Sequence, residues 1–227
     1  MWFRTSDMKR LFLCMAALAT YLPALATNFE VLVHDRDGNP LPDAVVVLYA
    51  IGKPTPAPPA PPDSPWIISQ EHMKFHPAVT VTVPGASLQF TNLDRYDHHV
   101  RGALLQPGMA VFDDSATHAF EMYLNGRKDG KDPTAMTQRV EKPGVYLLGC
   151  HLHGSMRGHI FVTDSAWTLK SDANGRGRFD NLMPGGYKVR IWHPGLILEG
   201  PPQELKLTEG TVTQAYTLEV SARKGRF

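Results

Sequence analysis

A proline-rich stretch, residues 54–65, constrains the fold of this chain more than any other part of it. Seven of its twelve residues are proline, so it can neither donate a ladder of backbone hydrogen bonds nor continue a helix. We expect an extended connector of the polyproline type, with no place inside a sheet. The connector therefore marks a boundary between the folded parts of the chain on its two sides.

Short runs of alternating apolar and polar residues occur on both sides of the connector. Before it, the runs 29–34 and 43–50 flank turn residues and predict a hairpin. After it, strands are expected at 79–83, 87–91, 99–105, 144–150, 159–162, 168–170, 178–180, 187–192, 203–207 and 214–220. The 19 glycines and 19 prolines supply turns between them. The pattern predicts an all-β chain, with irregular structure or a short helix at 115–124.

The first residues have the pattern of an export signal. Lys9 and Arg10 precede an apolar run over 11–22, and Ala24 and Ala26 place small residues at the cleavage-determining positions. The run is shorter than the about 20 apolar residues that a membrane-spanning helix needs. We expect residues 1–26 to be a signal peptide, the remaining chain to be periplasmic, and no membrane span within it.

Removal of this segment would leave 20 basic and 21 acidic residues. Nucleic acid is not an expected partner, because such a chain lacks the positive charge that phosphate-backbone binding needs. The same cleavage removes Cys14 and leaves Cys150 as the one cysteine, so no internal disulfide can form. A lone thiol in an oxidising compartment is prone to oxidation unless something occupies it.

Cys150 begins a motif that is typical of a metal site. His153 follows three residues later, and Met156 three residues after that, in a loop between two expected strands. Thiolate, imidazole and thioether together favour copper over hard cations, and one further imidazole would complete the ligand pattern of a blue copper site. His98 or His99 supplies it. Only one of the two can reach the metal, because neighbouring strand residues point to opposite faces.

These residues resemble the cupredoxins, in which an asparagine at a strand end precedes the first histidine ligand and a Cys, His, Met loop closes the copper site. The loop spacing is that of amicyanin, and the whole arrangement is similar to exported cupredoxin-like proteins labelled methylamine utilization protein. The resemblance implies a Greek-key β-sandwich over residues 66–164. It favours His98 over His99 and implies one type 1 copper ion held by His98, Cys150, His153 and Met156.

A second resemblance joins the two ends of the chain. Residues 33–46 and 171–189 resemble the two halves of a carboxypeptidase-regulatory, transthyretin-like β-sandwich. The resemblance implies a discontinuous domain of residues 27–52 and 166–227, with 53–65 as a linker. The cupredoxin-like domain, 66–164, would then be inserted in this sandwich or packed on it.

Four protein ligands would leave copper no open position for a substrate, which favours outer-sphere electron transfer over catalysis. The chain also lacks the sequence signatures of a serine hydrolase, a phosphate loop or a zinc protease. We expect a monomeric electron carrier, not an enzyme, with an unidentified redox partner protein. Its docking surface is expected around His153, from Leu152, Gly154, Met109 and Pro107.

Two other classes of function stay open. The protein could bind and deliver copper without carrying electrons, or it could be a metal-free module that binds carbohydrate or a surface protein. A second metal at His151 is not expected, because the additional His-x-His pairs of a copper cluster are missing. The remaining histidines, expected at the surface or in hydrogen bonds, are His72, His76, His118, His159 and His193.

Overall fold

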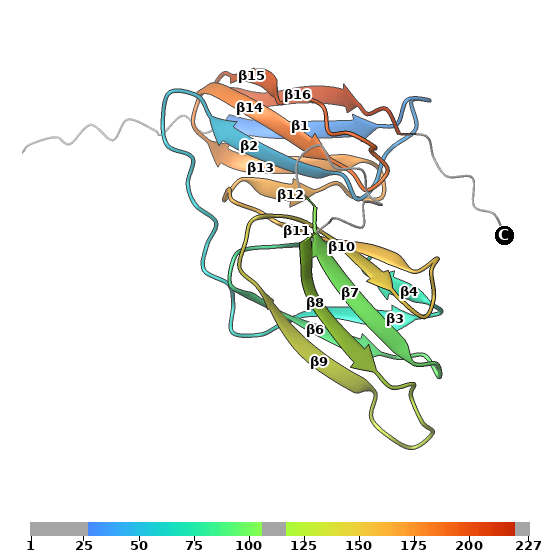
Figure 1. The fold of residues 1–227 in the computed structure, drawn as a ribbon. Coiled ribbons are helices and arrows are strands. Elements are labelled where there is room, and N and C mark those ends of the chain that lie inside the picture. The colour runs from blue at the N-terminus through green and yellow to red at the C-terminus, as the bar shows by residue number, and fades with distance from the viewer. Residues whose placement is uncertain (1–26, 106–116, 221–227) are drawn as a thin grey trace, which may run out of the picture.

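The computed structural model describes residues 27–105 and 117–220. These residues form strands and no helix, so the prediction of an all-β chain is confirmed. No helix that could cross a membrane is found within the described part of the chain. Figure 1 shows two stacked β-sandwiches, the first built from both ends of the described chain and the second from its middle. The expected signal peptide, residues 1–26, lies outside the described residues.

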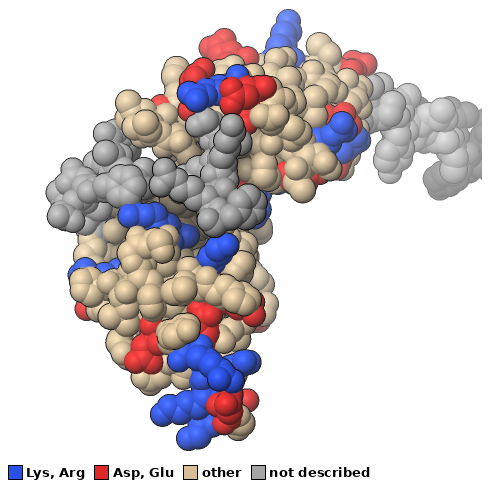
Figure 2. Space-filling model, turned by 90° about the vertical axis from the view of Figure 1, so that its right-hand side faces the viewer, with Lys and Arg blue, Asp and Glu red and all other residues tan. Residues whose placement is uncertain are grey.

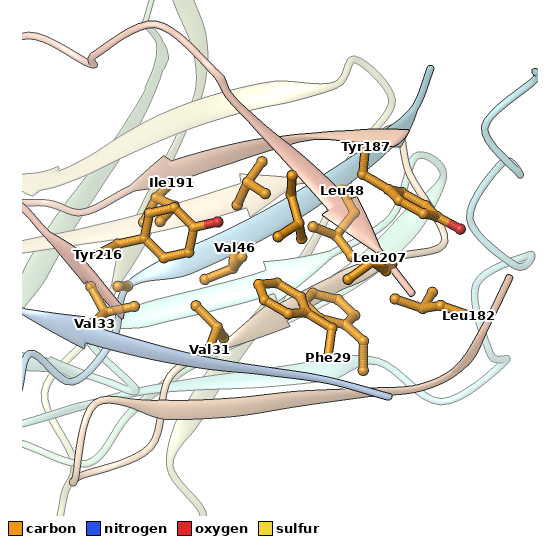
Figure 3. Close-up of a cluster of buried hydrophobic side chains, with 14 of the residues drawn as sticks. Phe29, Val31, Val33, Val46, Leu48, Leu182, Tyr187, Ile191, Leu207 and Tyr216 are labelled. Atoms are coloured by element: carbon orange, nitrogen blue, oxygen red, sulfur yellow. The ribbon is translucent and has the colours of Figure 1, made fainter. Parts of the chain in front are cut away.

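The first sandwich joins the N-terminal strands to the C-terminal ones. A three-stranded sheet in the order β13-β1-β16 packs on a four-stranded sheet in the order β12-β2-β14-β15. The strands are β1 Thr27–His34, β2 Val45–Ala50, β12 Thr168–Lys170, β13 Arg176–Leu182, β14 Gly185–Trp192, β15 Gln203–Leu207 and β16 Gly210–Thr217. Figure 3 shows the apolar core between the sheets. Phe29 of this core stacks on Phe179, with ring centroids 6.0 Å apart.

The second sandwich holds the middle of the chain. A five-stranded sheet in the order β5-β11-β10-β7-β8 packs on a four-stranded sheet in the order β4-β3-β6-β9. The strands are β3 Trp66–Glu71, β4 Lys74–His76, β5 Val79–Thr82, β6 Ala86–Asn92, β7 His98–Leu104, β8 Thr117–Leu124, β9 Thr134–Val140, β10 Gly144–Cys150 and β11 Arg157–Val162. The proline-rich segment links β2 to β3, and residues 54–62 lie in no strand.

Two strands are buried on both faces, and they lie where the sandwiches meet. Alternate residues of β2 enter the first core, whereas Val45 and Val47 pack in a separate cluster with Phe161 of β11. Trp192 of β14 joins the same cluster, with its ring 5.7 Å from that of Phe161. The apolar run of β2 and the shorter one over residues 160–162 of β11 therefore have a structural cause, since both faces of each strand are covered there.

The expectation of irregular structure or a short helix at 115–124 is wrong for residues 117–124, which form strand β8. Residues 115 and 116 lie outside the described residues. Phe120, Met122 and Leu124 are all buried and alternate with exposed residues, which is the period of a strand. The pattern also did not predict β3, β4 and β9. β9 is the longest of these three strands. It exposes most of its side chains, so its alternation of apolar and polar residues is weak.

Gly175 provides a test of how the two ends of the chain are joined. It lies in the turn before β13, with φ of +69°, and its carbonyl accepts a 2.7 Å hydrogen bond from the Val33 N–H of β1. A Cβ at this position would collide with the Val33 carbonyl oxygen, whereas a Cβ on Gly38, with φ of +83°, would meet nothing within 4 Å.

We predict that Gly38→Ala lowers the free energy of unfolding by about 1–2 kcal/mol, the ordinary cost of a left-handed residue. Gly175→Ala should lower it further, by about another 1–3 kcal/mol of steric overlap. Urea denaturation of both variants measures the difference. Equal losses would contradict the packing of this turn on β1.

Candidate metal centre

The antiparallel pairing of β7 with β10 brings two distant parts of the sequence together. Cys150 pairs with Val100 in the register, and the His151 N–H donates a 2.9 Å hydrogen bond to the His99 carbonyl. The first residue of β7, His98, therefore lies beside the last residue of β10, Cys150. Both side chains are buried, with His98 at 0% and Cys150 at 5% exposure.

Three donor atoms converge at this end of the second sandwich. Cys150 Sγ lies 3.6 Å from His98 Nδ1 and 3.5 Å from His153 Nδ1, and the two Nδ1 atoms are 3.2 Å apart. Within the described ranges, these residues form the one group of histidine, cysteine and acidic side chains whose donor atoms all lie within 4.8 Å of one another.

The separations between these donor atoms can be compared with those around a bound ion. Metal–sulfur and metal–nitrogen bonds of about 2.3 and 2.0 Å would place such donors roughly 3.3–3.7 Å apart around one ion. The observed distances of 3.2–3.6 Å lie close to that range. The three side chains therefore fit a single metal ion without rearrangement of the backbone.

The loop between β10 and β11 supplies the other sulfur of the expected ligand set. The Met156 N–H donates a 2.9 Å hydrogen bond to the His153 carbonyl, which folds the loop into a tight turn. Met156 is 1% exposed and belongs to the same core cluster as Cys150. The Met156 thioether therefore lies in the core that contains Cys150, on the loop that carries His153, and a donor set of thiol, imidazole and thioether suits copper.

A buried carboxylate fixes the orientation of the His98 ring. Asp94 Oδ2 lies 2.9 Å from His98 Nε2, on the side of the ring away from Cys150. Because an ionised carboxylate only accepts hydrogen bonds, Nε2 must carry the ring proton and Nδ1 keeps its lone pair for a metal. Asp94 therefore selects the tautomer in which His98 can act as a ligand.

Asp94 is itself held by the turn between β3 and β4. Its oxygens accept hydrogen bonds from the backbone N–H groups of His72, at 2.6 Å, and Met73, at 2.9 Å. Burial would raise the pKa of Asp94, but the hydrogen bonds from Met73, His98 and His72 outweigh burial and lower it. His72 and Met73 both have positive φ, an unfavourable conformation that these charge-assisted hydrogen bonds offset.

Asn92, the last residue of β6, holds the segment that carries Asp94. Its side-chain oxygen accepts a 2.9 Å hydrogen bond from the Asp94 N–H. Its amide nitrogen contacts the carbonyls of Tyr96, Leu124 and Asn125 at 2.7, 3.2 and 3.1 Å. The asparagine thus ties the loop before β7 to the end of β8, so the support of His98 extends across both sheets.

The structure places His98, and not His99, toward Cys150. His99 lies on the other face of β7, 28% exposed, with its Nε2 3.5 Å from Glu121 Oε2. The alternation of strand side chains accounts for this separation.

Asp94 was not among the expected site residues, since its role depends on hydrogen bonds from a turn that is distant in the sequence.

The expected docking residues are described only in part. Leu152 is 48% exposed and Gly154 is also exposed, on the loop that carries His153. Tyr96 adds an exposed aromatic ring that the sequence did not single out, with its centroid 6.5 Å from that of His153. Met109 and Pro107 lie outside the described residues.

No protein-family model and no curated protein matches the chain. Among solved structures, it is similar to amicyanin from Paracoccus versutus, with 20% identity, 45% of this chain and 84% of that chain covered, and a TM-score of 0.34. A purple cupredoxin from Nitrosopumilus maritimus has 17% identity, coverage of 43% and 99%, and a TM-score of 0.33. A reduced amicyanin variant has 18% identity, coverage of 53% and 99%, and a TM-score of 0.32.

The two adjacent histidines allow a matched substitution test. His98→Ala removes a buried donor atom 3.6 Å from Cys150 Sγ, so the visible absorption of the Cu(II)-loaded protein should disappear. His99→Ala alters only the outer face of β7 and should leave that absorption unchanged. Loss of the absorption in His99→Ala but not in His98→Ala would overturn the orientation described above.

Asp94→Asn tests the carboxylate that orients His98. The substitution weakens three hydrogen bonds to a buried charge, so the metal-free protein should lose about 1–3 kcal/mol of unfolding free energy. Its Cu(II) affinity should fall by about 10–100-fold. The control is Asp97→Asn, because Asp97 is exposed and accepts from Tyr123 Oη and the Gly126 N–H. An affinity loss as large in the control would contradict a specific role for Asp94.

Proposed function

We propose that His98, Cys150, His153 and Met156 hold one copper ion and that the protein carries single electrons between redox partners. The proposal depends above all on the convergence of Cys150 Sγ with the Nδ1 atoms of His98 and His153, all 3.2–3.6 Å apart. This donor set with a methionine is the pattern of blue copper sites. Bound copper would supply one-electron chemistry between Cu(II) and Cu(I).

Contacts with the surrounding protein hold the proposed donors in place, which supports this function. Asp94 fixes the His98 ring, and the ladder between β7 and β10 fixes the position of Cys150. The turn at 153–156 is closed by its own backbone hydrogen bond. Side chains that are held by such supporting contacts keep their geometry, so they would move little when the charge of the ion changes.

We further propose that electrons enter and leave through His153. It is less buried than His98 and Cys150, and Leu152 and Tyr96, at 48% and 61% exposure, lie on the segments around it. An apolar and aromatic surface of this kind suits a protein partner. Electron transfer would then need only transient docking there.

We do not propose that the redox partner is attracted by a surface patch of one sign of charge. The loop after β8 lies at the lower end of the molecule in Figure 1, and Figure 2 shows basic and acidic side chains side by side at that end. There Arg95 pairs with Asp129 at 2.9 Å.

We also propose that the protein is a monomer and that it is exported. The proposal of export depends on residues 1–26, which have the pattern of a signal peptide.

Met156→Leu tests the function and not only the fold. If Met156 is a weak axial donor, the variant should keep its blue colour and show a higher reduction potential, because loss of the thioether destabilises Cu(II) more than Cu(I). Protein-film voltammetry and visible spectroscopy measure both properties. Met122→Leu is the control, since Met122 is buried in the same core cluster on β8, and it should change neither.

Two outcomes would contradict electron transfer. If Met156→Leu abolished copper binding, Met156 would be a primary ligand of the kind found in transport sites. If the unchanged protein bound Cu(I) but gave no stable blue Cu(II) form, copper delivery would be the better description of its function.

A further inference from the structure

Polar side chains gather on the outer face of the five-stranded sheet, directly behind the candidate metal centre. Glu121 of β8 lies at the middle of this group. Its Oε2 atom is 3.5 Å from His99 Nε2, 3.5 Å from His118 Nε2 and 3.5 Å from Arg101 Nε. A single carboxylate oxygen is therefore approached by two imidazoles and one guanidinium.

His151 adds a third imidazole to this face. Its ring centroid lies 5.7 Å from that of His99, with the two planes at 74°. The inner pair, His98 and His153, has a similar arrangement, with centroids 4.9 Å apart and planes at 66°. Two imidazoles that bind one ion through ring nitrogens about 2.0 Å from it have their ring centres roughly 5–6 Å apart, so the centroid separation of the outer pair is compatible with a shared ion once the rings turn their nitrogens toward it.

We propose that His99, His118, Glu121 and His151 form a second metal site, which takes a divalent transition ion such as Cu²⁺ or Zn²⁺. Imidazole and carboxylate donors suit these ions, and without a thiolate the site does not favour Cu(I). This site is separate from the proposed blue copper site and does not depend on it. Cys150 and His98 point inward, while His151 and His99, the next residues along the chain, point outward.

The outer side chains can reach an ion because they are on the surface. His99 is 28% exposed, and His118 and Glu121 are 50% and 49% exposed. In the described part of the chain, only the inner group already has three donors within 4.8 Å. The outer donors must therefore move together when an ion binds, and their exposed side chains have room to rotate.

Arg101 competes with the proposed ion. It is 50% exposed and contacts the same oxygen of Glu121 as both histidines, so it neutralises the carboxylate while no metal is bound. A divalent ion would replace this guanidinium and take over the neutralisation of Glu121. Removal of the arginine should consequently strengthen metal binding, whereas removal of a histidine should weaken it.

Calorimetric titration with Zn²⁺ tests the proposal on the full-length protein. The double variant His99→Ala, His118→Ala should bind one equivalent fewer than the unchanged protein, and Arg101→Gln should bind that equivalent at least about 10-fold more tightly. His34→Ala is the control, because His34 lies on β1 in the other sandwich, and it should behave like the unchanged protein. These are surface substitutions, and circular dichroism verifies that each variant is folded.

Electron paramagnetic resonance with Cu²⁺ distinguishes the two sites. The outer ion should give a spectrum with nitrogen ligands and no accompanying visible thiolate band, and this spectrum should vanish in the double variant while the blue signal stays. Equal stoichiometry in the double variant and the unchanged protein would overturn the outer site. Absence of a blue band in every protein would instead contradict the proposed function and leave the outer site standing.

Discussion

The antiparallel ladder between β7 and β10 is the constraint on which the candidate site depends. Its register pairs Cys150 with Val100, and its last hydrogen bond joins His151 N–H to the His99 carbonyl. This register turns His98 and Cys150 toward each other inside the sandwich and His99 and His151 outward. A slip of one residue would turn Cys150 and His98 to opposite faces of the sheet, so this pairing determines which side chains of β7 and β10 meet inside the sandwich and which meet on its outer face.

The inner group is supported by a chain of polar contacts that reaches well beyond the donors. Asn92 at the end of β6 holds the Asp94 backbone, and Asp94 holds both the His98 ring and the turn before β4. Each of these groups has hydrogen-bond partners within the protein, which allows the polar side chains to remain buried.

Much of this could be predicted from the sequence, because the signals are local. The short alternating runs gave the all-β class, and the spacing of Cys150, His153 and Met156 pointed to a loop with metal-binding chemistry. The choice of His98 over His99 came from a family resemblance, since nothing local distinguishes two adjacent histidines. In the structure the choice follows from the register of β7, which is a long-range property.

Other features could not be predicted because their causes are distant in the sequence. Asp94 owes its role to hydrogen bonds from the turn at His72 and Met73, which belongs to another part of the sequence. The outer cluster needs β8 and β10 on either side of β7, an order that no single stretch of sequence shows. Sequence patterns therefore identify donors within one loop better than donors that several strands bring together.

The visible absorption and electron paramagnetic resonance of the Cu(II)-loaded protein, followed through chemical reduction and reoxidation, test the central proposal most directly. An electron carrier with a cysteine-ligated copper should show an intense thiolate-to-copper band that disappears on reduction and returns on reoxidation, with the metal retained. A Cu(II) complex without that band, or loss of the ion in each cycle, would contradict electron transfer by this site.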